Sequence, residues 1–466
     1  MAHAPDPFYD PFVSRHPLLL ALLLLATLRV AYTSAAAPVT VTVDASVRHQ
    51  TFRGWEVAIQ ATVRDFLPVL PGYDDLLRQA ATDLGITRLK VNVFSGTEGP
   101  RGAAARYVQG DLSEREFLKD HAYRIVNDNG NPDVANLEGF DFTLLDWQMG
   151  TVVMPMLRDL DDAGHHGELI VQYGDYGASS FEHLSRPREY AEFMQVVFDH
   201  LRTTYGVTPA AVDVVNEPDV GNRWGGADIG DAMVAAGRRL EKSGYRPAFM
   251  APSPMDRGRA LPMLADMLRA KDAERYIRMV TYHCYADSGR DSLAKIGEVV
   301  SRAGVESAQN ECWSELNDPE ALMADLTVAQ VSSWHQATFH GPNGYYSVDA
   351  QTGRASLRPK TRLLRQFYKY VRPGAVRVDA TATSDAVKAA AFLAPDGAPV
   401  VILVSRGPAE ANVTGLPEGT YDVSYTTPAA FDVHQPQVRV ASGEPLPVSI
   451  PSSGVLTVRG LAGHAP

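Results

Sequence analysis

The sequence predicts an α/β protein, a (β/α)8 TIM barrel with an appended all-β sandwich domain. Between about residues 51 and 345, short β-branched stretches alternate with stretches of helical periodicity, which is the pattern of repeated βα units. From about residue 372, only short strand candidates separated by turns follow. The chain has 466 residues, whereas one barrel needs only about 250 residues. We therefore expect a barrel over residues 51–371 and a sandwich over residues 372–466.

The predicted barrel strands are short and rich in apolar and β-branched residues, as buried parallel strands are. Eight such strands close a barrel of this type. The candidates span residues 51–58, 86–94, 168–173, 211–215, 247–251, 278–282, 305–309 and 336–340.

Two segments between the predicted strands stand out. Residues 187–201 place Tyr190, Phe193, Val197 and Leu201 at helical spacing, which predicts a helix with a packing face. Residues 100–141 are rich in Gly, Asp and Asn and show little apolar periodicity, which predicts a long loop. A long loop after the second barrel strand would shape access to the barrel rim.

The sandwich is predicted from short strands at close intervals, separated by turns such as Pro395-Asp396-Gly397. An early strand within residues 38–50 is expected to join it, because apolar and polar residues alternate from Pro38 to Asp44. The other candidates span residues 376–378, 387–393, 400–404, 420–425, 438–440 and 455–458.

Residues 1–37 are predicted to form a signal peptide or an N-terminal anchor. An apolar core at residues 18–28 is too short to span a membrane, and small residues near Ala36 suit a cleavage site. We expect a secreted, extracellular protein, with an uncleaved anchor as the alternative. A net charge of −12 and a pI near 5.5, without clustered Lys or Arg, argue against nucleic acid or an anionic membrane as partner.

The chain contains two cysteines, Cys284 and Cys312. Two cysteines exclude a disulfide-rich scaffold and a cysteine-based zinc site. If their strands are neighbours, both side chains share the outward parity, and a disulfide could form in an oxidising compartment. Two buried free thiols are an equally open alternative.

Two glutamates that end predicted strands carry the functional prediction. Glu217 follows a β-branched run and precedes Pro218, and Glu311 ends a later extended run. The carboxyl ends of parallel barrel strands meet at one rim. Two carboxylates at one rim are what glycoside hydrolysis requires, one as acid and the other as nucleophile or base.

Several other side chains are predicted to lie at the same rim. His283 and Tyr285 share parity on the sixth predicted strand, so the phenol of Tyr285 could hydrogen-bond Glu311 and keep it ionised. Trp55, Tyr176 and Trp313 are candidate stacking surfaces for sugar rings, although a core position is equally compatible with each.

The chain resembles the retaining glycosidases of clan A, and among them glycoside hydrolase family 30, which includes glucosylceramidases and xylanases. The resemblance covers most of the chain after about residue 40. Its motifs are residues 50–56, similar to the family's opening strand; Asn216-Glu217-Pro218; His283-Cys284-Tyr285; Glu311; and residues 368–375, similar to the start of the family's sandwich domain.

The resemblance implies roles for individual residues. Glu217 would be the general acid/base and Glu311 the nucleophile, with carboxyl groups about 5–5.5 Å apart. Asn216 would hold the sugar 2-hydroxyl, and Tyr285 would steady Glu311. His283 and Lys90 are also expected to bind substrate, although Lys90 stands where the clan usually has an Arg and so offers different hydrogen bonding. No metal or cofactor is expected, and His165-His166 is interpreted as a solvated loop.

The predicted function is a retaining β-glycosidase acting on a β-linked oligosaccharide, polysaccharide or glycoconjugate. The family's Ser-Pro-Trp on strand three is replaced by residues 172–176, and the Trp of its His-Trp-Tyr is Cys284, so its specificities do not transfer. Two alternatives stay open: a transglycosylase using the same site, and a catalytically silent carbohydrate-binding protein.

Overall fold

The structure is a computed structural model that describes residues 37–59, 72–177, 179–287, 290–313, 318–339, 344–349 and 351–461. The predicted targeting segment, apart from Ala37, lies outside these residues. Across the described ranges, no helix has the length and apolar character needed to cross a membrane.

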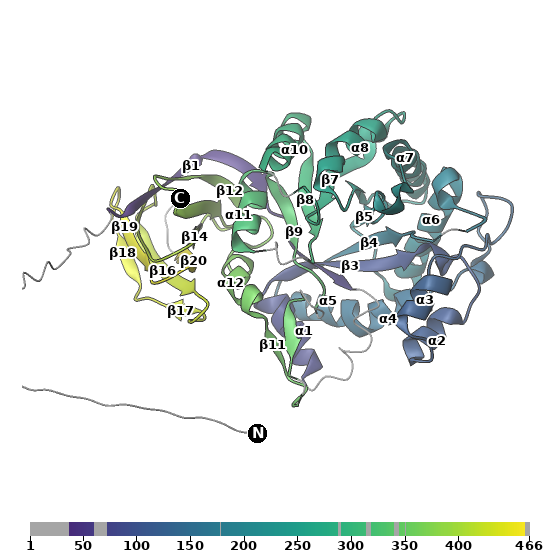
Figure 1. Ribbon diagram of the computed structural model, residues 1–466, viewed down its shortest axis with the longest axis horizontal. Coiled ribbons are helices and arrows are strands. Elements are labelled where there is room, and N and C mark those ends of the chain that lie inside the picture. Colours follow the sequence, from purple (N-terminus) through teal and green to yellow (C-terminus); the bar gives the residue numbers. More distant parts are fainter. Residues whose placement is uncertain are drawn as a thin grey trace, which may run out of the picture. The chain divides into compact units, whose positions relative to one another are not determined.

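Eight parallel strands form a closed barrel (Figure 1), which confirms the predicted fold class. The barrel closes where β2 pairs with β9, with Trp55 opposite Trp334. The strands are β2 (Gly54–Ile59), β3 (Ile86–Phe94), β4 (Glu168–Gly174), β5 (Ala211–Asp213), β6 (Ala248–Pro252), β7 (Ile277–His283), β8 (Glu306–Glu311) and β9 (Val331–His335).

The eighth strand was predicted at the wrong residues. The prediction placed it at 336–340, whereas β9 covers Val331–His335. This strand contains two polar residues, Ser332 and Ser333, and both are buried in the barrel wall. The first predicted strand, 51–58, overlaps β2 but starts too early, because Thr51 belongs to β1 and the barrel strand begins at Gly54.

Helices follow the barrel strands and lie around the barrel (Figure 1). The predicted helix at 187–201 is α6, which begins with Pro187 in its first turn and ends before Gly206 in the left-handed conformation. The helices are α1 (Tyr73–Thr82), α2 (Ala103–Gln109), α3 (Glu114–Asp120), α4 (Thr143–Gln148), α5 (Met154–Asp162), α6 (Pro187–Tyr205), α7 (Gly226–Lys242), α8 (Ala260–Met267), α9 (Ala273–Tyr276), α10 (Arg290–Ala303), α11 (Pro319–Thr327) and α12 (Pro359–Tyr368).

The segment 100–141 is not the continuous loop that the sequence predicted, because it contains α2 and α3. Ser113 and Glu116 form a capping box at the start of α3, with each side chain bonded to the other residue's backbone. This local signal was present in the sequence, but helices of seven residues show too little periodicity to be noticed.

The second domain is one ten-stranded sheet. The early strand β1 lies in this sheet, antiparallel to β12 and parallel to β15. Residues from both ends of the sheet share one hydrophobic core, so the sheet folds over itself as a sandwich. Its strands are β1 (Val39–Thr51), β12 (Val376–Ala382), β13 (Val387–Leu393), β14 (Pro399–Ser405), β15 (Ala409–Thr414), β16 (Gly419–Thr426), β17 (Val433–His434), β18 (Val438–Val440), β19 (Leu446–Ile450) and β20 (Gly454–Gly460).

The interior of the barrel is divided between apolar and charged side chains. One cluster is apolar and consists of Ile170, Ala211, Met250, Met279 and Ala308. Three charged side chains are also buried inside the barrel: Arg88 and Lys90 on β3 each pair with Glu56 on β2. Branched apolar residues usually fill this space, so the buried charges depart from the usual filling of such a barrel.

Candidate active site at the barrel mouth

Glu217 lies just beyond β5, in strained backbone. The regular strand ends at Asp213, and the amide of Glu217 then donates to the carbonyl of Ser253 on the next strand's loop at 3.1 Å. Glu217 has φ 47°, in the left-handed region that a residue with a β-carbon rarely adopts. This conformation turns the carboxylate into the barrel mouth.

A β-bulge directs Glu311 into the same mouth. On β8, Gln309 is paired with Tyr282 and Glu311 with His283, so Asn310 is the extra residue. The Asn310 amide reaches into the barrel and donates to Asp213 at 2.9 Å. In a regular strand Glu311 would point the opposite way from Asn310. The bulge allows both side chains to face inward.

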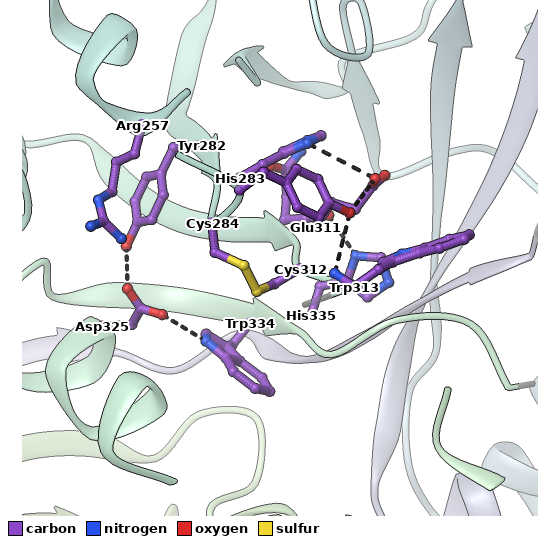
Figure 2. The surroundings of a disulfide bond; sticks show 12 residues. Arg257, Tyr282, His283, Cys284, Glu311, Cys312, Trp313, Asp325, Trp334 and His335 are labelled. Carbon is purple, nitrogen blue, oxygen red and sulfur yellow. Dashed lines mark hydrogen bonds and ion pairs between the residues drawn. A yellow bond between two sulfur atoms is a disulfide. The ribbon is translucent and has the colours of Figure 1, made fainter. Parts of the chain in front are cut away.

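The two carboxylates and the imidazole of His283 form a compact cluster. Ligand atoms of Glu217, His283 and Glu311 all lie within 4.8 Å of one another. Nδ1 of His283 is 3.3 Å from Oε1 of Glu217 and 4.0 Å from Oε1 of Glu311. Figure 2 shows His283 and Glu311 side by side at the ends of their strands.

Two tyrosines orient the carboxylates. The hydroxyl of Tyr285 donates to Oε1 of Glu311 at 3.0 Å and accepts the backbone N–H of Trp313 at 3.2 Å. The hydroxyl of Tyr176 donates to Oε2 of Glu217 at 3.0 Å. Asn216 in turn donates from its amide to the Tyr176 hydroxyl at 2.5 Å. Each glutamate therefore accepts a hydrogen bond from a different tyrosine.

The charge states of the two carboxyl groups are linked because the groups lie so close together. Burial and the negative charge of Glu217 raise the pKa of Glu311. Burial also acts on Glu217, but the hydrogen bonds from His283 and Tyr176 outweigh it and hold the pKa of Glu217 below its usual range. Such a pair loses its two protons in separate steps, with a singly protonated form between them.

His283 carries a proton more readily than a free histidine. Burial alone lowers its pKa, but the negative charges of Glu311 and Glu217 outweigh burial and raise the pKa. The Nδ1 atom of His283 faces the two carboxylates. The ring is fully buried and therefore offers no surface to a sugar.

Lys90 lies four residues before the end of β3, below the rim. Its ammonium donates to the carbonyl of Asn310 at 2.5 Å and pairs with Glu56 at 3.4 Å. Since its side chain is fully buried, the prediction that Lys90 binds substrate is wrong. Its charge nevertheless lowers the pKa of both Glu217 and Glu311, so it acts on the site from beneath.

Trp55 is also not part of the mouth. Side chains alternate along β2, so Glu56 points into the barrel and Trp55 points outward. The fully buried indole donates to the carbonyl of Val371 at 2.8 Å and packs 4.7 Å from the ring of Tyr368. The prediction of a stacking surface is therefore wrong, and Trp55 belongs to the core.

The other two predicted stacking residues do lie near the carboxylates. Tyr176 is half-buried, and its ring contacts Tyr123 edge-on at 5.4 Å. Trp313 is half-buried next to Glu311 (Figure 2). Stacking of a sugar on either ring stays a prediction.

A polar floor beneath the carboxylates was missed by the sequence reasoning. The fully buried Asp213 accepts hydrogen bonds from Ser253 at 2.6 Å, Gln172 at 2.9 Å and Asn310 at 2.9 Å. Gln172 also donates to the side-chain oxygen of Asn216 at 2.9 Å. An Asp inside an otherwise apolar strand was the available signal, because a buried carboxylate needs partners.

The sequence left open whether the two cysteines form a disulfide or remain free thiols, and the structure answers this question. Cys284 and Cys312 form a disulfide, with Cα atoms 5.2 Å apart (Figure 2). The bond links the residue after His283 to the residue after Glu311.

Glu217, His283 and Glu311 also have the donor types and spacing of a metal-binding cluster. Tyrosine hydroxyls already donate to both carboxylates, and this arrangement suits a shared proton better than a cation. His165 and His166 are exposed.

The chain is similar in sequence to known proteins of one glycoside hydrolase family. Residues 374–430 match the family model of the glycosyl hydrolase family 30 beta sandwich domain. Over 167 residues, the chain is 28% identical to an endo-1,6-beta-D-glucanase of Neurospora crassa. The match covers 30% of this chain and 35% of that protein, so the chain matches about a third of this relative's length. The resemblance to glycoside hydrolase family 30 is confirmed.

Solved structures agree at the level of the fold. A family 30 endoxylanase from Clostridium papyrosolvens is similar with a TM-score of 0.62 at 16% identity, covering 91% of this chain and 100% of that one. An endo-beta-1,6-glucanase is similar with a TM-score of 0.63 at 13% identity, covering 91% and 94%.

Proposed function

We propose that this protein is a retaining glycoside hydrolase that cleaves β-glycosidic bonds by double displacement. Glu217 is the general acid/base and Glu311 the nucleophile. The observation that carries the proposal is the spacing of the two carboxylates, which have oxygens within 4.8 Å of each other. Inverting enzymes leave about 6.5–9.5 Å between the carboxyl groups to admit a water molecule, whereas retaining enzymes do not.

The hydrogen bonds support this division of roles. Both oxygens of Glu217 have partners, His283 and Tyr176. Tyr285 binds only Oε1 of Glu311, and no described residue donates a hydrogen bond to its Oε2. An oxygen without a donor retains its electron density for attack on an anomeric carbon.

In the first step, Oε2 of Glu311 bonds to the anomeric carbon while Glu217 gives its proton to the departing glycosidic oxygen. A glycosyl ester of Glu311 results. In the second step, ionised Glu217 takes a proton from water, the water oxygen bonds to the anomeric carbon and the ester bond breaks. Both carboxyl groups then return to their starting states.

Proton placement is part of the proposal. The pKa shifts favour the shared proton on Glu311 in the free protein, whereas the first step needs it on Glu217. Proton transfer therefore accompanies substrate binding. Nδ1 of His283 lies within 4.0 Å of both carboxylates and is the group placed to mediate the transfer.

The substrate proposed is a β-linked glycan. The matched relative is an endo-1,6-beta-D-glucanase and one similar structure is an endoxylanase, so β-1,6-glucan and xylan are the first polysaccharides to test. We also propose that the protein is exported, which the disulfide supports because such bonds persist in oxidising compartments.

The test uses aryl β-glycosides of several sugars together with the two polysaccharides. Glu311→Gln and Glu217→Gln should each lower kcat at least about 100-fold. An activated dinitrophenyl leaving group should restore the first step in Glu217→Gln but not in Glu311→Gln. Azide should rescue Glu311→Gly with an α-configured glycosyl azide.

Near-wild-type turnover by both folded Gln variants would overturn the proposal. Loss of wild-type turnover in a chelator, restored by a divalent cation, would instead support a metal at the cluster. Saccharide binding without turnover would indicate a binding protein, and transfer to sugar acceptors in preference to water would indicate a transglycosylase.

A further inference from the structure

The ends of β7 and β8 are joined beyond the point where their regular pairing stops. The last backbone pair is His283 with Glu311. The next residue on each strand belongs to the disulfide between Cys284 and Cys312. One residue further, the hydroxyl of Tyr285 accepts the backbone N–H of Trp313 at 3.2 Å. Three successive residue pairs are thus connected in one register.

The disulfide lies outside the reacting space. Glu311 and His283 face the mouth, and neighbouring side chains along a strand point to the opposite face. Figure 2 shows the two sulfur atoms on the far side of the strand ends from the carboxylate of Glu311. Cys284 and Cys312 therefore affect chemistry only through the residues that flank them.

We propose that the Cys284–Cys312 disulfide is a clamp that holds Glu311 in register with His283 and Tyr285, and so makes both cysteines positioning residues for the nucleophile. The inference rests on the proposed function of Glu311. At position 284 the chain has a Cys where the family resemblance leads one to expect a Trp.

The physical reason is the weakness of the ladder at this point. The bulge at Asn310 interrupts the pairing just before Glu311, and a bulge leaves its extra residue unpaired. Beyond Glu311 neither strand continues. Without the covalent link, the 3.0 Å hydrogen bond from Tyr285 to Glu311 would depend on noncovalent contacts of Tyr285, such as its hydrogen bond with the Trp313 backbone and its edge-on packing against His283.

Removal of the clamp should leave the barrel folded. Four pairs of β7 and β8 precede the last one, from Met279 with Glu306 to Tyr282 with Gln309. Behind these strands, Tyr282 and Trp334 both donate to the buried Asp325, at 2.8 and 2.9 Å (Figure 2). These contacts do not involve either sulfur.

The main experiment compares the wild type with the Cys284→Ser/Cys312→Ser double variant, using the aryl glycoside that the wild type turns over best. Loss of nucleophile alignment should lower kcat about 10- to 100-fold, with KM within about 2-fold because sugar binding is not removed. The acid limb of the kcat profile should move to higher pH, since a loosened Tyr285 stabilises ionised Glu311 less.

Reduction offers the same test on the unmodified chain. A water-soluble phosphine transfers two electrons to the disulfide, giving two thiols and the phosphine oxide, whose oxygen comes from water. Mass spectrometry after thiol alkylation should show two labels after reduction and none before. The reduced wild type should match the double variant in kcat, and reoxidation should restore it.

Asp325→Asn is the matched control, because it alters the network behind the same strands without touching the clamp. It should leave kcat and the pH profile unchanged. A folded double-Ser variant with wild-type kcat and pH profile would overturn the clamp, as would equal changes in Asp325→Asn.

Failure of the proposed function would be seen separately. A wild type that turns over none of the glycosides would refute the proposed glycosidase activity. The clamp can still be tested by measuring the titration of the His283 imidazole. Its NMR titration midpoint, assigned with His283→Gln, should shift between the wild type and the double-Ser variant. An identical midpoint in both would reject the clamp independently of turnover.

Discussion

The two walls of the barrel mouth are built differently. The Glu311 wall consists of β7 and β8 and is joined by backbone pairing, a disulfide and a tyrosine hydroxyl. The Glu217 wall consists of β4 and β5, where Glu217 lies four residues past the end of the strand. There, the backbone of Glu217 donates to Ser253, and side-chain hydrogen bonds from Tyr176 and, across the mouth, from His283 hold the carboxylate.

The difference follows the demands of the two proposed roles. A nucleophile must reach one carbon atom along one direction, and small displacements are costly. An acid/base must only come within hydrogen-bond distance of an oxygen that can itself adjust. Glu311 is accordingly the more buried, with 7% of its side chain exposed against 17% for Glu217.

The largest effect is expected from the residue that acts on both walls. Lys90→Met removes a buried positive charge that lowers the pKa of both Glu217 and Glu311. Both limbs of the kcat profile should therefore move to higher pH. The variant should also lose about 3–5 kcal/mol in free energy of unfolding, because Glu56 is left with less compensation in the barrel. Urea unfolding and pH–rate profiles measure the two effects.

The Lys90→Met/Glu56→Gln double variant separates stability from chemistry. It should recover part of the lost stability, because the buried carboxylate is gone as well. Its pH profile should stay shifted, since no positive charge returns beneath the carboxylates. An unshifted profile in both variants would show that Lys90 is only structural.

The next effect is confined to the Glu311 wall. Tyr285→Phe removes the hydroxyl that donates to Glu311 and lowers its pKa. The pKa of Glu311 should rise, so activity should be lost at a higher pH as the solution is acidified. A hydrogen bond to a charged group contributes about 1.5–3 kcal/mol, which corresponds to a loss of about 10- to 100-fold in kcat at neutral pH. A profile without a displaced acid limb would contradict this.

Tyr176→Phe is the counterpart on the Glu217 wall. Its hydroxyl lowers the pKa of Glu217, so the variant should hold the Glu217 proton to higher pH and the alkaline limb should move upward. The loss in kcat should be about 3- to 10-fold, because His283 still contacts Glu217. Displacement of the same limb in both Phe variants would mean that the two walls are not distinct.

The sequence was sufficient to predict the barrel and the pairing of the two carboxylates. A β-branched run before Glu217 and an extended run before Glu311 identify strand ends, and strand ends of a parallel barrel share a rim. Tyr285 was placed correctly beside Glu311 because the two-residue period of a strand relates it to His283.

The sequence was insufficient where the regular alternation of side chains along a strand is interrupted. The bulge at Asn310 and the left-handed backbone of Glu217 have no local sequence signal, yet both decide where the carboxylates point. The depth of a side chain inside the barrel was a second property that the sequence did not predict. Periodicity assigns Lys90 to the inside of the barrel, but not to a level below the rim, so its contact with substrate was wrongly expected. Trp55 was misjudged because aromatic residues serve cores and sugar sites equally well.

The smallest effect on the barrel mouth is expected from a change at Asp325, which lies behind the Glu311 wall. Burial raises the pKa of Asp325 to about 6 despite hydrogen bonds from Trp334 and Tyr282. The folded protein therefore binds more protons at this group than the unfolded chain, where the pKa is about 3.9. Stability from Asp325 is fully present below about pH 4 and falls as pH rises to about 6, by at most about 3 kcal/mol. Asp325→Asn should lack this decline in urea unfolding between pH 4 and 7 while its kcat stays unchanged, and parallel stability curves for the two proteins would contradict the expectation.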